Sequence, residues 1–426
     1  MAEAQLKETP TEAMIAALDM PQGGWSHAAR EDALARVRAM GLPQRRDEYW
    51  KFTRPDTLTQ AGAQPAAIFD HGDAPLFDGT ERLRIVFADG VFDAEASDDL
   101  TLEGVSIERL AAADSDLHWA RDLYGTLEKN GQAPVQRPLA ALNTAFATDG
   151  VLIHVTGTPS KPINLVYHHK SETSDAMLHH VVKLDKGAEV TLLENGPAAA
   201  RFNTVMEVEV ADTARFHHVR AQGRDHERRA ATHVFTRLGT GSLFKSFTVT
   251  VNGALTRNEC VIELTGDDAS AHVAGACVGD GDFHHDDTVF ITHDAENCES
   301  RQVFKKVLRN GATGVFQGKI LVKEGAQKTD GYQISQSLLL DGDSQFLAKP
   351  ELEIYADDVA CSHGSTSGAI DEEALFYLRA RGVSHAEATD LLTLAFLAEA
   401  VEEIEAEELR EEITGRLSSW LERRSA

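Results

Sequence analysis

The segment DKGAEVTLLE (185–194) joins a tight polar turn to a short run of β-forming residues, and this pattern recurs along the middle of the chain. In each copy Asp or Gly is followed by a small residue and then by an apolar one. The small residues, with spacings of 26, 28, 27, 26, 17, 14 and 18, are Ala188, Ala214, Ser242, Ala269, Ala295, Ala312, Ala326 and Ser344. A β-rich period in the twenties predicts a stacked solenoid, in which each coil buries its inner face against its neighbours.

The runs between these turns are rich in β-branched and apolar residues, as in VMEVEV (205–210) and KSFTVTV (245–251). A β-sandwich is the alternative architecture, but its strands recur every ~8–12 residues. The longer period therefore favours a mostly β fold with a β-helix core over residues 150–370.

Residues 1–149 are expected to form a helix-rich N-terminal region. One helix is expected to begin after Ser26 and to stop at Gly41, and another to span 137–150. Asp89-Gly90 lies between two apolar runs and predicts a hairpin over 83–94.

Residues 371–426 are expected to form a C-terminal helical region with 14 acidic and 6 basic residues. Asp371 opens the first helix, and Ser384 with Glu387 forms a capping box for the second. The expected apolar stripes are Leu391, Leu394, Ala395, Ala398 and Val401 in the second helix, and Leu409, Ile413, Leu417 and Leu421 in the third. The charge run EEIEAEE (402–408) between them predicts a solvated face or a bend. Such stripes must pack on the β core or form a docking surface, and both alternatives stay open.

The composition restricts the class of partner. The 426-residue chain has a formal charge of −27, which disfavours nucleic acid and anionic membranes as general partners. The N-terminus lacks a secretory signal pattern, and no apolar run reaches the ~18 residues of a membrane-spanning helix. Four cysteines without a CxxC pair do not form a disulfide framework, and a reduced, cytoplasmic setting is expected.

The stretch VACSHGSTSGAI (359–370) carries the most suggestive chemistry. Cys361 and His363 would lie on the same face of an extended strand. A covalent hydrolase is disfavoured, because Thr366 takes the serine position of a nucleophile elbow and no third catalytic group is evident. As metal ligands the pair supplies two donors where three or four are needed, so the others must come from elsewhere in the fold or from a second chain. The alternative is a buried cysteine beside a surface histidine.

A second group of donor residues lies in FHHDDTVFITHDAENCESRQ (283–302), but its spacing matches no metal motif. We interpret His293 and Cys298 within it as structural. The chain has no P-loop, no GxGxxG after a strand and no HExxH, which disfavours ATP hydrolysis and a Rossmann site on this chain.

Two longer stretches resemble a known family. SRQVFKKVLRNGATGVFQGKILVKEGAQKTDGYQISQSLLL (300–340) and KPELEIYADDVACSHGSTSGAIDEEALFYLRARGVS (349–384) are similar to the SufB/SufD family of the SUF iron–sulfur cluster assembly machinery. ALNTAF (141–146) and YWKFT (49–53) extend the likeness more loosely towards the N-terminus. SufB-like members carry a cysteine near the segment DGDSQF (341–346), which this chain lacks, so the likeness is to the SufD branch.

The resemblance implies a right-handed parallel β-helix core between the N-terminal and C-terminal helical regions. It implies a non-catalytic subunit of the SufB–SufC–SufD scaffold that pairs with SufB through the β-helix and binds the ATPase SufC through residues 371–426. His363 and Cys361 match interface positions that would help to hold iron or a nascent iron–sulfur cluster transiently, with further donors from SufB. Reduced flavin on the complex, a homodimer of the isolated chain and movement of the C-terminal helices on SufC dimerisation are further expectations. The alternatives are a purely structural partner of SufB and a stand-alone carbohydrate-active β-helix enzyme.

Overall fold

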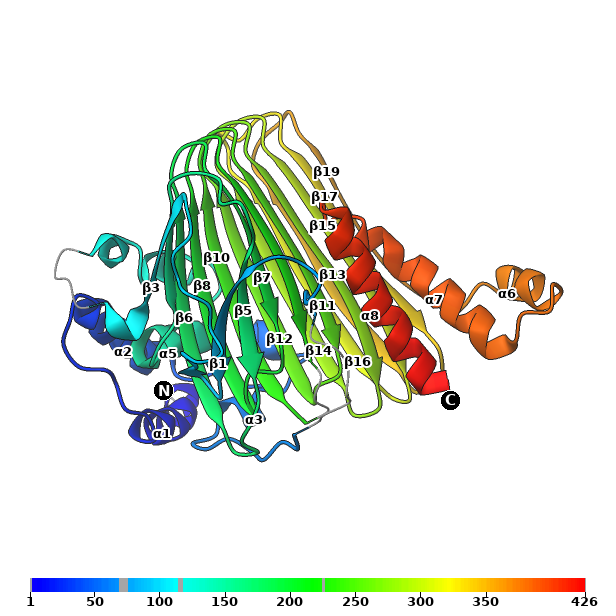
Figure 1. The fold of residues 1–426 in the computed structure, drawn as a ribbon, viewed down its shortest axis with the longest axis horizontal. Coiled ribbons are helices and arrows are strands. Elements are labelled where there is room, and N and C mark those ends of the chain that lie inside the picture. Colours follow the sequence, from blue (N-terminus) through cyan, green and yellow to red (C-terminus); the bar gives the residue numbers. More distant parts are fainter. Residues whose placement is uncertain (1, 69–75, 114–117, 224–226, 426) are drawn as a thin grey trace.

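A computed structural model describes residues 2–68, 76–113, 118–223 and 227–425 of the chain. The fold is mostly β, with a parallel β-solenoid of about seven turns between N-terminal and C-terminal helices (Figure 1). Within the described residues, no helix is both long enough and apolar enough to cross a membrane.

The solenoid consists of two sheets, because successive strands alternate between them and each coil gives one strand to each. Sheet A has the order β19 (Ala360–Gly368), β17 (Asp330–Leu339), β15 (Glu299–Arg309), β13 (Ser270–Asp280), β11 (Leu243–Val251), β9 (Arg215–Gln222), β7 (Glu189–Asn195), β5 (Ile163–His168), β1 (Leu83–Ala88) and β2 (Val91–Phe92). Sheet B has the order β18 (Gln345–Ile354), β16 (Thr313–Val322), β14 (His284–His293), β12 (Leu255–Leu264), β10 (Arg229–Leu238), β8 (Arg201–Val210), β6 (Asp175–Leu184), β4 (Val151–Val155) and β3 (Val105–Arg109). All pairings are parallel except β1–β2 and β3–β4. The right-handed winding stays a prediction.

The predicted turn pattern is confirmed as the corner that leads into sheet A, but the single series of small residues is wrong beyond Ala269. The residues that directly precede strands of sheet A, at spacings of 26, 28, 27, 29 and 31, are Ala188, Ala214, Ser242, Ala269, Cys298 and Thr329. Each follows a residue in the left-handed conformation, with φ between 57° and 74°: Gly187, Thr213, Gly241, Asp268, Asn297 and Lys328. Ala312 and Ser344 instead precede strands of sheet B, because both corners of a coil use similar turn residues.

Hydrophobic layers inside the solenoid and on its outer faces hold the fold together. The inner faces of the two sheets form a core of residues such as Phe216, Ile262 and Phe316. The N-terminal helices pack on the outer face of sheet B, where Trp50 and Leu142 contact residues of the solenoid strands. These helical elements are α1 (Ala2–Ala16), α2 (His27–Met40), η1 (Glu48–Trp50), α3 (Asp56–Thr59), η2 (Leu110–Ala112), η3 (Trp119–Asp122), α4 (Thr126–Asn130) and α5 (Pro138–Phe146).

The hairpin expected over 83–94 is confirmed, since β1 and β2 pair around Asp89 and Gly90, both with positive φ. The helix expected after Ser26 is also confirmed and ends before Gly41. The helix expected over 137–150 is shorter and stops at Phe146, where the chain turns into β4.

Three helices follow the solenoid: α6 (Glu372–Arg379), α7 (His385–Val401) and α8 (Glu407–Ser425). The Asp371 and Ser384 side chains cap α6 and α7 as expected. The apolar stripe predicted for α8 is confirmed, and Ile413 and Leu417 lie buried on the outer face of sheet A. The stripe predicted for α7 is wrong at Leu391, which is 46% exposed, and at Ala395, which is also exposed. The residues of α7 that are buried are Ala388, Thr393, Leu397, Ala400 and Val401.

Candidate functional site: the open rim and its surroundings

The solenoid ends in two strands that each have one unpaired edge. Within the described residues, β18 pairs only with β16 and β19 only with β17, so both strands present free backbone groups at the last coil. Every residue of β18 is at least partly exposed, and Ile354 and Tyr355 are 39% and 61% exposed. We call β18, β19 and the segment between them the rim. Unpaired edges beside exposed apolar side chains are typical of a surface that binds another chain.

Cys361 and His363 lie on β19 at this rim. They pair in register with Gly331 and Gln333 of β17, both on the inner face of the solenoid, so the two side chains share a face as predicted. Cys361 is half-buried against the cluster that contains Ile320, whereas His363 is exposed. Gly331 leaves room for the thiol, since a Cβ there would lie 3.2 Å from Sγ.

The chemistry of the pair is that of an incomplete ligand set. Burial raises the pKa of the Cys361 thiol above its ordinary value, so the thiol is protonated at neutral pH and must lose its proton to bind a metal. Nowhere in the described part of the chain do three His, Cys, Asp or Glu side chains gather in a geometry that could hold a metal ion. The rim therefore offers two donors of the right type, and a complete coordination shell needs donors from another molecule.

The donors of segment 283–302 do not gather at one site, because strand alternation divides them between two faces. His284 faces Thr53 of the N-terminal region, whereas His285 faces Lys306 inside the solenoid. His293 is fully buried and bonds to the Ser300 hydroxyl at 2.8 Å. Cys298 occupies the small-residue position of a corner, with Sγ 3.3 Å from the Gly266 carbonyl oxygen. These contacts support the structural interpretation of His293 and Cys298.

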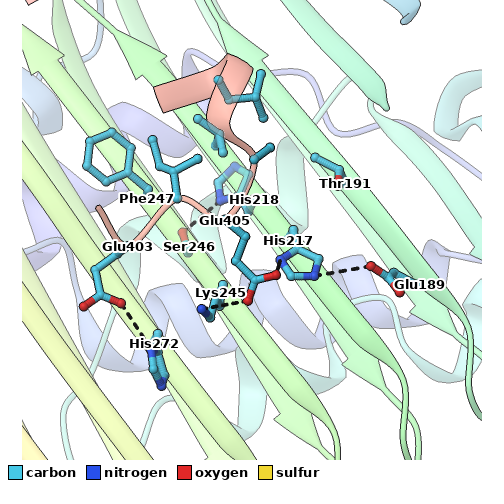
Figure 2. Close-up of a pocket in the computed structure, with 14 residues that line it drawn as sticks. Glu189, Thr191, His217, His218, Lys245, Ser246, Phe247, His272, Glu403 and Glu405 are labelled. Atoms are coloured by element: carbon cyan, nitrogen blue, oxygen red, sulfur yellow. Dashed lines mark hydrogen bonds and ion pairs between the residues drawn. The ribbon is translucent and has the colours of Figure 1, made fainter. Parts of the chain in front are cut away.

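A pocket of about 300 Å³ lies where the α7–α8 connection crosses sheet A (Figure 2). On the sheet side, four side chains at equivalent positions of neighbouring coils form a basic row: His217, Lys245, His272 and Arg301. The connection supplies Glu403 and Glu405. Glu403 binds His272 at 3.2 Å and Arg301 at 2.8 Å, and Glu405 binds Lys245 at 2.7 Å.

These ion pairs define the charge state of the connection. Although burial opposes it, hydrogen bonds from His272 and Arg301 hold the pKa of Glu403 below its ordinary value. The charge run predicted as a solvated face or bend is a bend, but Ile404 within it is buried at 3% exposure. We call the basic row together with Glu403 and Glu405 the clasp.

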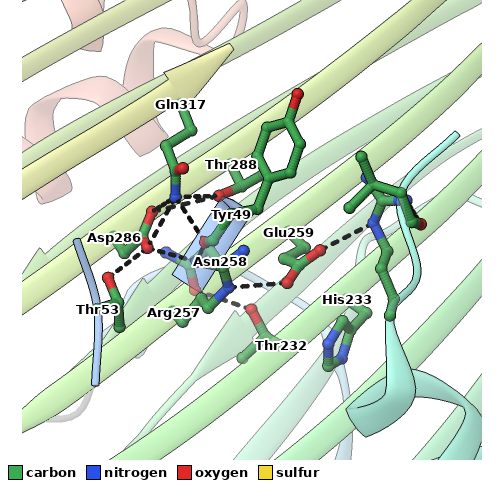
Figure 3. Close-up of polar contacts among 12 residues, drawn as sticks. Tyr49, Thr53, Thr232, His233, Arg257, Asn258, Glu259, Asp286, Thr288 and Gln317 are labelled. Carbon is green, nitrogen blue, oxygen red and sulfur yellow. Dashed lines mark hydrogen bonds and ion pairs between the residues drawn. The ribbon is translucent and has the colours of Figure 1, made fainter. Parts of the chain in front are cut away.

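A buried polar network joins the N-terminal region to sheet B (Figure 3). Arg257 of β12 donates to Glu259 at 2.8 Å and also to Asp286 of β14. Arg137, which precedes α5, binds Glu259 at 2.8 Å. Although burial opposes it, Arg257 and Arg137 lower the pKa of Glu259 to about 2, so this carboxylate is charged inside the protein. The network fixes the N-terminal region on the solenoid.

The clasp and the network were missed in the sequence because their members lie far apart in the chain. The basic row does carry a signal, since its residues follow one another at 28, 27 and 29 residues, which is the coil period. Its acidic partners come from beyond the solenoid and follow no period.

Comparisons with known proteins agree with this architecture. The family "SUF system FeS cluster assembly, SufBD core domain" matches residues 167–396, more than half of the chain. The chain belongs to the SufBD family. It is 28% identical to the iron–sulfur cluster assembly protein SufD of Escherichia coli over 91% of both chains. It is also 27% identical to a SufBD family iron–sulfur cluster assembly protein of Synechocystis, covering 88% of this chain and 86% of that one. A third relative is SufD of Bacillus subtilis, 27% identical over 67% of each chain.

The SufBD match begins at the last two residues of β5 and covers the solenoid strands from β6 onward, together with α6 and most of α7. It therefore includes the rim and the basic row. Membership makes this chain an iron–sulfur cluster assembly protein of the SUF system, and two of the relatives named above are SufD proteins.

Proposed function

We propose that this chain is a non-catalytic subunit of an iron–sulfur assembly scaffold and pairs through its rim with a SufB paralogue. The observation that carries the proposal is the pair of unpaired edges at β18 and β19, with Cys361 and His363 on the same face of β19. A second solenoid end of the same family would satisfy the free backbone groups and bury the exposed side chains. An isolated chain would satisfy them with a second copy, as a homodimer.

In this proposal His363 and Cys361 hold iron or a nascent cluster, which is cargo, in a shell that the partner completes. The exposed imidazole is accessible to the incoming ion. The half-buried thiol would become a ligand when the charge of the cation lowers its pKa and its proton passes to solvent. The low donor count on this chain makes binding transient until both subunits are present.

The α6–α8 region is the proposed binding surface for the ATPase SufC, which would carry the ATPase activity of the complex. Phe376 and Tyr377 of α6 are 73% and 56% exposed, and α6 extends away from the solenoid (Figure 1). Aromatic side chains on a projecting helix are suited to insertion into a groove of a partner. A cytoplasmic location and reduced flavin on the complex belong to the same proposal.

The test is co-expression of this chain with SufB and SufC, followed by iron and acid-labile sulfide analysis of the purified complex. We expect His363→Ala and Cys361→Ala to leave the complex assembled but to lower its cluster content. Ser362→Ala, on the opposite face of β19, is the matched control. Normal cluster content in both rim variants would leave the chain as a purely structural partner, and failure of the wild-type chain to co-purify with SufB would reject the pairing itself.

A further inference from the structure

The segment 48–53 reaches from the N-terminal region along the outer face of sheet B to the rim. Tyr49 makes most of its contacts with the strands. The Tyr49 carbonyl oxygen accepts hydrogen bonds from Arg257 Nη1 of β12 at 2.9 Å and from Gln317 Nε2 of β16 at 3.1 Å. Its ring packs edge-on against Phe290 of β14, with the centroids 5.1 Å apart. Its hydroxyl donates to Glu351 of β18. One residue therefore contacts four successive strands of sheet B, the last of which is a free edge.

The neighbours of Tyr49 strengthen the contact at the edge. Lys349 of β18 lies over the Tyr49 ring, with Nζ 3.8 Å from the centroid, and binds Glu48 at 2.7 Å. Burial, with Glu351 beside it, raises the pKa of the Tyr49 hydroxyl, so the hydroxyl stays protonated and can donate. The contact thus combines a charge-assisted hydrogen bond, a cation–π contact and an ion pair.

The other end of the segment is rooted in the buried network. Thr53 donates to Asp286, and the guanidinium of Arg257 packs 4.1 Å from the centre of the Trp50 ring. Arg257 and Asp286 are 1% and 0% exposed. Trp50 and Thr53 are therefore held by buried residues of the solenoid. Glu48 and Tyr49, at the other end of the segment, contact β18, which has a neighbouring strand on one side only.

Edge strands open more easily than strands with two neighbours. A strand that must pair with another chain loses affinity if it is disordered beforehand, because its ordering costs free energy on binding.

We propose that Tyr49 is a positioning residue that, with Glu48, holds the edge strand β18 ordered and in register for pairing with a partner. The ordering of β18 is a property of the isolated chain, and only its consequence for affinity rests on the proposed pairing function. The N-terminal region is on this view part of the partner-binding apparatus, although it lies outside the rim.

The test is hydrogen–deuterium exchange of β18 in the isolated chain, at a dilution where size-exclusion chromatography shows a monomer. Tyr49→Phe keeps the ring and removes only the bond to Glu351, and we expect the amides of residues 345–354 to exchange up to about tenfold faster. Glu351→Gln, at the other end of the same bond, should speed exchange in the same segment. Tyr355→Phe is the matched control, because it removes a hydroxyl bond to the exposed Glu353 without touching the N-terminal region. Unchanged exchange of β18 in both Tyr49→Phe and Glu351→Gln overturns the proposal.

Partner binding separates this proposal from the proposed function. If β18 exchanges faster and binding of the SufB paralogue weakens by a similar factor, both stand. If β18 exchanges faster while binding is unchanged, Tyr49 orders the strand but β18 is not the pairing edge, which overturns the consequence for affinity. If Tyr49→Phe unfolds thermally at the same temperature as the wild type, the faster exchange reflects local opening of β18 and not a loss of global stability.

Discussion

Helices cover both outer faces of the solenoid, but the two coverings use charge differently. The N-terminal helices meet sheet B through the network of Arg257, Glu259 and Asp286, in which all three side chains are buried. The C-terminal helices meet sheet A through an apolar stripe on α8, and their charged groups form the clasp, where the Lys245 and Glu405 side chains are 21% and 43% exposed. Similar ion pairs are therefore fixed parts of the core on one face and adjustable, solvent-screened contacts on the other.

The largest effect is expected for Arg257→Met, which breaks the buried network. It leaves Asp286 and Glu259 buried without their shared guanidinium, and removal of one partner from a buried pair costs about 3–5 kcal/mol. A lowered urea midpoint and faster proteolysis of the N-terminal region would report the loss. The control is Arg237→Met, because its pair with Glu209 has side chains 38% and 27% exposed. Equal midpoints for the two variants would contradict the contrast between the faces.

Next in size is Ile413→Ala, which tests whether apolar packing rather than charge holds α8. Ile413 is 0% exposed on the outer face of sheet A, and truncation of such a side chain costs about 2–5 kcal/mol. We expect early proteolytic release of the C-terminal helices, measured by mass spectrometry. Leu391→Ala on the exposed face of α7 should behave as wild type. If Leu391→Ala were the more sensitive, the assignment of the buried face would be wrong.

An intermediate effect is expected from pH. Burial lowers the pKa of His180 and of His233 to about 4 and of His285 to about 3, whereas the ordinary value is 6.5. Below pH 6.5 these histidines are protonated in the unfolded chain but stay neutral in the folded chain. The free energy of unfolding is therefore highest above pH 6.5 and falls as the pH drops towards 4. Each histidine contributes about 2 kcal/mol of this loss at pH 5.

The measurement is the urea midpoint at pH 7 and pH 5, where His233→Gln should show a smaller decrease than wild type. Glu259 does not interfere in this window, because its pKa of about 2 places its own loss at lower pH. Burial raises the pKa of Glu207 to about 7, so this carboxyl offsets part of the loss as the pH falls. An equal decrease in wild type and His233→Gln would mean that His233 is charged in the folded protein at pH 5.

The smallest effect is expected at the clasp. Glu405→Gln removes the pair with Lys245 and should cost about 0.2–1 kcal/mol at low salt. The difference from wild type should vanish in 1 M salt, where the Debye length falls to about 3 Å, while that of Arg257→Met persists. Glu402→Gln, an exposed neighbour, is the control. If the loss of stability in Glu405→Gln did not depend on salt, the ion pairs of the clasp would be as desolvated as those of the buried network.

The sequence could predict what repeats locally or follows a period. The coil corners, the caps at Asp371 and Ser384 and the shared face of Cys361 and His363 depend on residues close in the chain, and the structure has them as expected. The series of small residues failed after Ala269, because two kinds of corner share the same turn chemistry and Cys298 and Thr329 take the place of alanine.

The contacts between distant segments could not be predicted in this way. Tyr49 and Glu351 are 302 residues apart, and Lys245 and Glu405 are 160 apart. Neither pair belongs to a local pattern, because the partners meet only after the solenoid has formed and helices have folded back on it. The stripe of α7 was misplaced for the same reason, since α8 and sheet A decide which face of α7 is buried.

Because the coils stack in register, the number of coils sets the length of the solenoid. Each further coil advances the axis by one strand spacing, ~4.8 Å, and repeats one member of the basic row. Duplication or loss of a whole coil of 27–29 residues, the spacing from His217 through Lys245 and His272 to Arg301, would shift the terminal strands relative to the amino-terminal helices in steps of that size. Evolution could thus adjust the reach of such a protein without redesigning either end.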